Sequence, residues 1–112
     1  MRIVSGIHRG RKINPPNNLD VRPTTDRAKE ALFSILDNRY YFDGKNVLDL
    51  FSGTGNISYE FASRGAEHVT SIDDNSKCIQ FIESINTKLD FKNSCIKSDC
   101  LDYLENCNKQ FN

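Results

Sequence analysis

Residues 47–56, with the sequence VLDLFSGTGN, are the most informative part of this 112-residue chain. An apolar run that carries an acid, Asp49, and continues into Gly-Thr-Gly predicts a β-strand, a tight turn and the start of a helix. The two glycines let the backbone approach a ligand, and the free N–H groups of the next helix face it. A second strand-like run, residues 68–72, ends at Asp73, 18 residues after Gly55. A carboxylate there can accept both hydroxyl protons of a ribose, so the pattern predicts a site for a nucleoside-type cofactor.

The composition is that of a globular domain, with 38% hydrophobic and 27% charged residues. No stretch approaches the roughly 20 apolar residues that cross a bilayer. The first residues lack the pattern of a secretory signal. We therefore expect a cytoplasmic protein that is not membrane-bound.

The four cysteines form no C-x-x-C pair, and both histidines lie far from them in sequence. This spacing argues against a metal site and favours reduced, mostly buried thiols.

The charges are unevenly distributed although the net charge is zero. Residues 1–40 hold eight Lys or Arg against four Asp or Glu, whereas residues 41–112 hold seven against eleven. A basic front end suggests an anionic partner, although an ordinary solvated surface explains the charges equally well.

The pattern of apolar residues predicts two parts, 1–40 and 41–112. The first contains a hairpin of two short strands, 2–5 and 11–13, a loop at 14–18, and a helix capped by Thr24 or Thr25. That helix is expected to face the core through its apolar stripe, Ala28, Ala31, Leu32, Ile35 and Leu36.

In the second part, strands alternate with helices. We expect strands at 47–51, 69–72 and 95–98, and helices at 57–64, 76–89 and 101–107. The second helix would bury Cys78, Ile79, Ile82 and Ile85, and the third Leu101 and Leu104. This alternation predicts a partial parallel sheet with helices on both faces, a Rossmann-like α/β fold. Half of such a sheet leaves an apolar edge uncovered, which suggests a fragment of a longer protein or a chain completed by association.

Asp49 bears on which cofactor the glycine turn would hold. The dinucleotide fingerprint G-x-G-x-x-G is incomplete, because its third glycine is replaced by Ser58. A carboxylate at Asp49 would repel a pyrophosphate but not the cationic sulfonium and amino groups of S-adenosylmethionine, so it favours S-adenosylmethionine over NAD. Alternatively, Asp49 only hydrogen-bonds the turn. Asp99 could accept the amino proton of an adenine beside Cys100, or could simply cap the last helix.

Three stretches resemble the RsmD family, bacterial methyltransferases that modify a guanine N2 in small-subunit ribosomal RNA. They are RGRK at 9–12, RPTTDRAKEALF at 22–33 and DLFSGTG at 49–55. The resemblance covers nearly the whole chain, and the block at 22–33 is its most specific part. It implies an S-adenosylmethionine-dependent methyltransferase fold and a cofactor site formed by Asp49, Phe51, Ser52, Gly53, Thr54, Gly55, Asn56, Asp73, Asp74, Asp99 and Cys100. It implies RNA contacts by Arg9, Arg11, Lys12, Arg22, Thr24, Thr25 and Arg27.

The chain departs from this family in one respect. The family orients the guanine amine with an Asn/Asp-Pro-Pro-Tyr/Phe motif after its fourth strand, but no proline follows Pro23. The segment NPPN at 14–17 lacks the aromatic residue and is interpreted as a loop. We therefore expect an incomplete, inactive N-terminal part of an enzyme that is monomeric at full length and acts on ribosomal RNA or the small ribosomal subunit. The alternatives are a fragment of an NAD-type oxidoreductase and a non-catalytic RNA-binding module.

Overall fold

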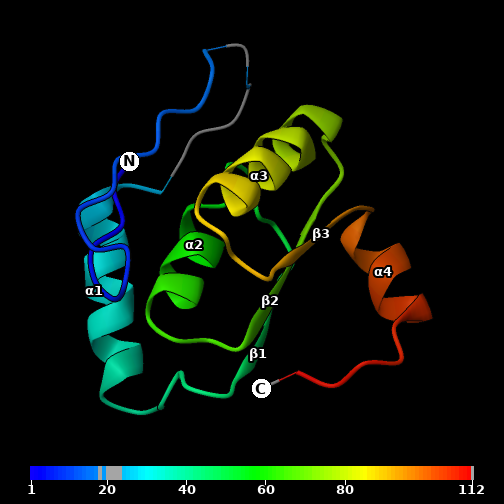
Figure 1. Cartoon of the computed structure of the whole chain (residues 1–112). Helices are drawn as coiled ribbons and strands as arrows, with labels where there is room; N and C mark the ends of the chain where they lie inside the picture. Colours follow the sequence, from blue (N-terminus) through cyan, green and yellow to red (C-terminus); the bar gives the residue numbers. More distant parts are fainter. Residues whose placement is uncertain (18, 20–23, 112) are drawn as a thin grey trace.

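The computed structural model describes residues 1–17, 19 and 24–111 and contains a three-stranded parallel sheet (Figure 1). The strands are β1 (Asn46–Asp49), β2 (His68–Asp73) and β3 (Ser94–Lys97), in the order β1-β2-β3. Their carboxyl ends lie at one edge of the sheet because all three run in the same direction. The strands predicted at 47–51, 69–72 and 95–98 are confirmed, with ends that differ by one or two residues.

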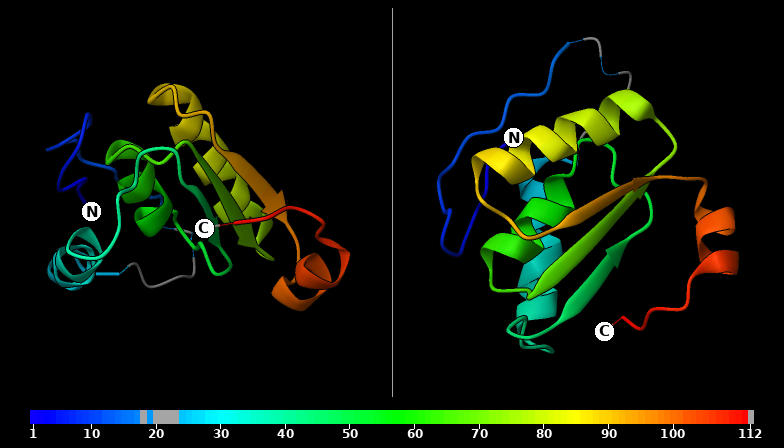
Figure 2. Two further views of the ribbon diagram at one scale, coloured as in Figure 1. Left: turned by 90° about the horizontal axis from the view of Figure 1, so that it is seen from below. Right: turned by 45° about the vertical axis from the view of Figure 1, so that its right-hand side comes forward.

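Three helices connect or follow these strands: α2 (Asn56–Ser63), α3 (Ser76–Lys88) and α4 (Cys100–Asn106). Two residues after the end of α2, Gly65 has a φ of 112°, which favours glycine, and Ala66 N–H donates to the Phe61 carbonyl at 3.0 Å. The side chain of Asn75 caps α3 by accepting from two backbone N–H groups. Figure 2 shows α2 and α3 on one face of the sheet and α4 on the other, which confirms the predicted fold class.

The main core lies between α2, α3 and the N-terminal residues. It contains Ile3, Ile13, Tyr59, Ile82, Ile85 and Leu89. The predicted buried side of α3 is confirmed, because Cys78, Ile79, Ile82 and Ile85 are all buried. The prediction for α4 is wrong, because Leu101 and Leu104 are exposed.

The predicted N-terminal hairpin forms only in part. A single antiparallel bridge joins Arg2 to Lys12, with no continuous strands. The backbone N–H groups of Val4 and Ser5 instead donate to the carboxylate of Glu60 on α2, at 2.9 and 3.0 Å. Residues 1–3 still pair with residues 10–13, since Ile3 N–H donates to the Arg11 carbonyl and Ile13 N–H to the Met1 carbonyl, both at 2.9 Å. Pairing ends at Val4 because α2 accepts its N–H group instead.

The helix α1 (Asp26–Asp37) begins as predicted, because Thr25 Oγ1 accepts from Ala28 N–H at 3.1 Å. Its predicted core face is wrong. Leu32 and Ile35 are exposed, whereas Lys29 and Phe33 are the buried residues of the helix. Lys29 is buried because it pairs with Glu60, and Phe33 because its ring packs against those of Phe42 and Phe61.

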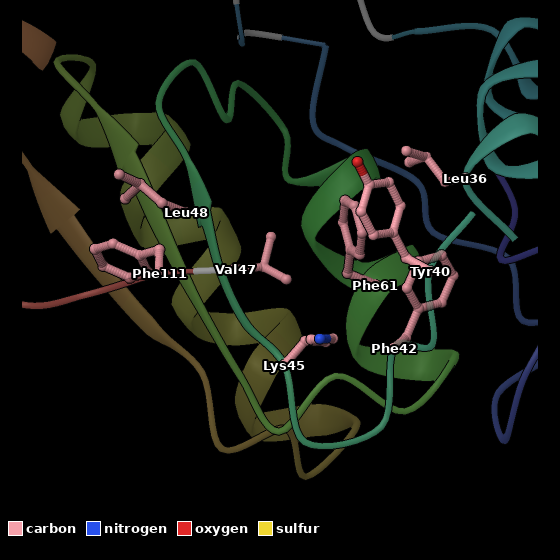
Figure 3. Close-up of a pocket in the computed structure, with 8 residues that line it drawn as sticks. All are labelled: Leu36, Tyr40, Phe42, Lys45, Val47, Leu48, Phe61 and Phe111. Atoms are coloured by element: carbon pink, nitrogen blue, oxygen red, sulfur yellow. The ribbon is translucent and has the colours of Figure 1, made fainter.

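The outer edge of β1 has no strand partner among the described residues. A cavity of about 610 Å³ lies beside it (Figure 3), lined by Leu36, Tyr40, Phe42, Lys45, Val47, Leu48, Phe61 and Phe111. The pattern of three strands and their helices in the sequence predicts such an apolar edge. No helix in the described part of the chain has the length and apolar character to cross a membrane.

Candidate cofactor site and RNA-facing surface

The glycine turn connects β1 to α2 and has an open side. Gly53 and Gly55 adopt φ values of 54° and 86°, and Gly55 N–H closes the turn by donating to the Ser52 carbonyl at 2.8 Å. A Cβ atom on Gly55 would lie 2.5 Å from the Tyr59 ring, so its glycine is required by packing inside the protein. A Cβ atom on Gly53 would meet nothing within 4 Å, which leaves this side of the turn accessible to a ligand.

The side chains of the turn differ in where they point. The Phe51 side chain is 78% exposed, an unusual state for an aromatic ring. Ser52 and Thr54 are buried, and their hydroxyl groups donate to the Asp49 carbonyl and the Met1 sulfur. Ser52 and Thr54 can therefore meet a ligand only through backbone atoms, whereas Phe51 presents its ring.

Asp49 is held by a chain of buried hydroxyl groups. Ser71 Oγ donates to Ser58 Oγ at 2.7 Å, and Ser58 Oγ donates to Asp49 Oδ2 at 2.8 Å. Burial raises the pKa of the Asp49 carboxyl, against the lowering effect of hydrogen bonds from Ser58 and the Phe51 backbone. The nearby Asp73 charge raises this pKa further. A buried anion of this kind is stabilised by a cation placed beside it.

The Asp73 side chain, at the end of β2, links the turn after β1 to the turn after β2. Its Oδ2 atom accepts from Gly53 N–H at 2.8 Å and its Oδ1 atom from Asn75 N–H at 2.9 Å. Each carboxylate oxygen has a second acceptor position, so Asp73 can brace the turn and still accept protons from a ribose.

The remaining predicted cofactor residues meet Asp73 around a small cavity. This cavity, of about 70 Å³, is lined by Leu50, Phe51, Asp73, Asp74, Ser98, Asp99 and Cys100. Asp99 caps α4 as the alternative predicted, since its Oδ1 atom accepts from the N–H groups of Leu101 and Asp102. Neither of these bonds uses Oδ2. The larger cavity beside β1 is not the candidate site, because it contains none of these acids.

Asn56, the first residue of α2, turns its side chain inward. Its Nδ2 atom donates to the Thr24 carbonyl at 2.8 Å, and its Oδ1 atom accepts from Lys29 Nζ at 2.8 Å. Lys29 also pairs with Glu60 Oε1 at 3.1 Å, and both of these side chains are fully buried. These contacts connect the cofactor turn to the segment that precedes α1.

Sequence reasoning missed the buried residues that support the site, Lys29, Ser58, Glu60 and Ser71. A lysine and a glutamate in amphipathic helices are ordinarily solvated, so pattern alone gives no sign of this pair. The serines beside Asp49 are separated from it by 9 and 22 positions, and only the fold brings them together.

Most of the predicted RNA-facing residues lie on the surface. Arg9, Arg11, Lys12, Thr24, Thr25 and Arg27 are exposed, and Arg22 lies outside the described residues. The Thr24 carbonyl is bonded to Asn56, so this part of the segment lies beside the first turn of α2.

The four cysteines are free, and only Cys78 among them is buried. Burial, together with the nearby Glu83, raises the pKa of Cys95 to about 11. Within the described residues, no group of three or more His, Cys, Asp or Glu side chains could hold a metal ion.

Comparison with known proteins assigns the family. The family model described as Conserved hypothetical protein 95 matches residues 1–112. The chain belongs to this family, the RsmD family of methyltransferases. Among its relatives, the Ribosomal RNA small subunit methyltransferase D of Haemophilus influenzae is 41% identical over 65% of this chain and 37% of that protein. The protein of the same name from Escherichia coli K12 is 33% identical over 93% of this chain and 52% of that protein.

Solved structures show the same fold. The Escherichia coli protein yhhF, described as a methyltransferase, matches with a TM-score of 0.81 and 28% identity, over 93% of this chain and 55% of that one. The Haemophilus influenzae methylase HI0767 matches with a TM-score of 0.73 and 29% identity, over 98% of this chain and 58% of that one. The chain thus spans about half the length of the relatives it matches.

RsmD-family methyltransferases generally use S-adenosylmethionine. The residues at the turn fit this group by their chemistry. Gly53 leaves open space, the Phe51 ring is available for packing, and Asp73 and Asp99 retain acceptor positions.

Proposed function

We propose that this chain forms the cofactor-binding part of an S-adenosylmethionine-dependent methyltransferase that acts on the exocyclic N2 of a guanine in small-subunit ribosomal RNA. The observation that carries the proposal is the cavity at the carboxyl ends of the strands, where Asp73, Asp74 and Asp99 meet the open glycine turn. Ligands of open α/β sheets bind in the crevice outside these strand ends. The guanine and its position N2 are inferred from the family resemblance.

Each acid has a role that its position supports. Asp73 would accept the ribose hydroxyl protons, and Asp99 the adenine amino proton beside Cys100. Asp49 would attract the cationic methionine end, which a buried carboxylate favours over a phosphate. The bound cofactor supplies a methyl group on a sulfonium, and the chain's own residues would position it and exclude water.

The exposed basic and hydroxyl-bearing residues of the N-terminal part are proposed to contact RNA phosphates. Arg9, Arg11 and Lys12 lie on the hairpin, while Thr24, Thr25 and Arg27 lie at or near the start of α1. Phosphate contacts position a nucleic acid without reading its sequence. These residues would therefore contribute affinity rather than the choice of guanine.

Isothermal titration calorimetry with S-adenosylmethionine and with NADH tests the cofactor assignment. We expect binding of S-adenosylmethionine and weaker binding by the Asp73→Asn variant, which keeps an acceptor for only one of the two backbone N–H groups. Glu105→Gln, an exposed change on α4, is the control for losing one negative charge. Binding of NADH without binding of S-adenosylmethionine would contradict the assignment.

We also propose that methyl transfer needs the amine-orienting Asn/Asp-Pro-Pro-Tyr/Phe motif that the resemblance implies and the 112 residues lack. Incubation with radiolabelled S-adenosylmethionine and small ribosomal subunits should give no label in the RNA above background. Transfer at a rate close to that of a longer relative would refute this requirement.

A further inference from the structure

The turn at residues 5–10 is fixed on the last residues of α2. Ile7 N–H donates to the Ser63 carbonyl at 2.9 Å, and His8 N–H donates to Ser63 Oγ at 3.0 Å. Ser63 Oγ donates in turn to the Ser5 carbonyl at 2.7 Å. The His8 ring packs edge-on against Phe91, with ring centroids 5.0 Å apart. The backbone on both sides of Ile7 is therefore anchored to the body of the protein.

This anchored turn presents Ile7 to solvent. Its side chain is 82% exposed, although the neighbouring Ile3 and Ile13 are core residues. A single exposed apolar residue is common on protein surfaces and has no meaning by itself. Ile7 differs because the hydrogen bonds of its turn fix where it points, and because a β-branched side chain has little rotamer freedom to lose on binding.

The residues that follow Ile7 indicate what it would contact. Arg9, Arg11 and Lys12 are exposed, and none of them forms an ion pair within the part of the chain that the structure describes. Three exposed cations beside a rigid apolar tip complement the phosphates and the bases of a nucleic acid. Apolar side chains that pack against or between bases, with basic residues on the backbone, are a known mode of such recognition.

We propose that Ile7 makes an apolar contact with an unstacked base of single-stranded RNA, while Arg9, Arg11 and Lys12 hold the adjacent phosphates. This rests on the proposed function only in taking RNA as the partner. Single-stranded segments are the natural target, because their bases can be displaced from the stack. The contact lies at the carboxyl end of α2, whereas the glycine turn lies at its amino end, one helix of eight residues away. Ile7 would therefore contact RNA away from the reacting base.

Fluorescence anisotropy with a labelled single-stranded RNA of about 20 nucleotides, titrated at several salt concentrations, tests the proposal. We expect Ile7→Ala to weaken binding about three- to tenfold without changing the slope of log affinity against log salt. Arg9→Ala should instead lower that slope by about 0.7, the value for one phosphate contact on a single strand. Leu101→Ala, which truncates an apolar side chain 67% exposed on α4, is the matched control and should bind as the unmodified chain does.

An Ile7→Ala variant that binds single-stranded RNA as tightly as the unmodified chain overturns the proposal, as does an unmodified chain that does not bind it. A larger Ile7→Ala effect on duplex RNA, or a change in sedimentation that reveals self-association through Ile7, overturns it as well. Calorimetry with S-adenosylmethionine on the same samples separates the two claims. Normal cofactor binding with no Ile7 effect removes only this inference, whereas absent cofactor binding removes the proposed function.

Discussion

Asp49 illustrates at the scale of one residue how a site can reduce the stability of its own fold. Its carboxylate is removed from water and is supported by Ser58 and by the Phe51 backbone. Because its pKa is higher in the folded chain than in the unfolded one, the folded state holds the proton more tightly. The free energy of unfolding therefore falls as pH rises from the ordinary carboxyl pKa through the raised value.

We predict that Asp49→Asn stabilises the chain at pH 7 by about 0.5–2 kcal/mol, because it removes a buried charge. The same change should weaken binding of S-adenosylmethionine about tenfold or more, since a charged acceptor contributes about 1.5–3 kcal/mol. Urea unfolding from pH 4 to pH 8 should show the stability difference shrinking as pH falls, whereas the exposed change Glu105→Gln should show no such trend. If Asp49→Asn is as stable as the unmodified chain at every pH and binds S-adenosylmethionine with unchanged affinity, this role is contradicted.

Lys29 is a second residue whose importance comes from burial. Burial acts to raise the pKa of Glu60, but the Val4 backbone and the Arg64 and Lys29 side chains outweigh it and hold this pKa below its usual range. We predict that Lys29→Met lowers the free energy of unfolding by about 3–5 kcal/mol, because the buried Glu60 carboxylate loses one of its cationic partners. Lys29→Arg, which keeps the charge, should cost less. Equal losses in urea unfolding would indicate that shape, not charge, decides this position.

At the scale of elements, the N-terminal turn depends on its contact with α2. Gly6 has a φ of 91°, and a Cβ atom on it would lie 1.9 Å from the Ser63 carbonyl oxygen. Gly10 has a similar φ of 85°, but a Cβ atom on it would meet nothing within 4 Å. The two glycines therefore separate the effect of backbone strain from the effect of the contact.

We predict that Gly10→Ala lowers the free energy of unfolding by about 1–2 kcal/mol, the ordinary penalty for a non-glycine residue in the left-handed conformation. Gly6→Ala should cost clearly more, because the turn must also leave Ser63. Thermal unfolding measures the difference, and trypsin should cut at Arg9 or Arg11 faster in Gly6→Ala alone. Equal behaviour of the two variants would show that the turn is not fixed by this contact.

At the scale of the whole molecule, the outer edge of β1 is open to association, because no other described strand pairs with it. Val47 and Leu48 line the cavity beside this edge, and Phe111 from the C-terminal segment lies against it (Figure 3). An uncovered strand edge beside apolar side chains is a template for pairing with another chain.

We predict that the chain self-associates at high concentration and that Phe111→Ala strengthens this association by uncovering the edge. Leu48→Lys should weaken it, because charged residues protect strand edges. Analytical ultracentrifugation over a range of concentrations measures both effects. A chain and a Phe111→Ala variant that stay monomeric at every concentration would contradict the prediction.

The sequence determined the order and type of the elements from residue 44 onward, because strand runs, turn glycines and helix caps act over a few neighbouring residues. It also predicted that the candidate cofactor residues after the three strands lie close together, since parallel strands place their carboxyl ends at one edge. Only the tertiary structure decided which side of α1 is buried. A local apolar stripe predicted Leu32 and Ile35, but the distant Glu60 draws Lys29 into the interior and leaves that stripe exposed. The sequence also showed no sign of the serines beside Asp49 or of the Ser63 hydrogen bonds that hold the Ile7 turn. These contacts join residues far apart in the chain, and such contacts leave no periodic pattern in the sequence.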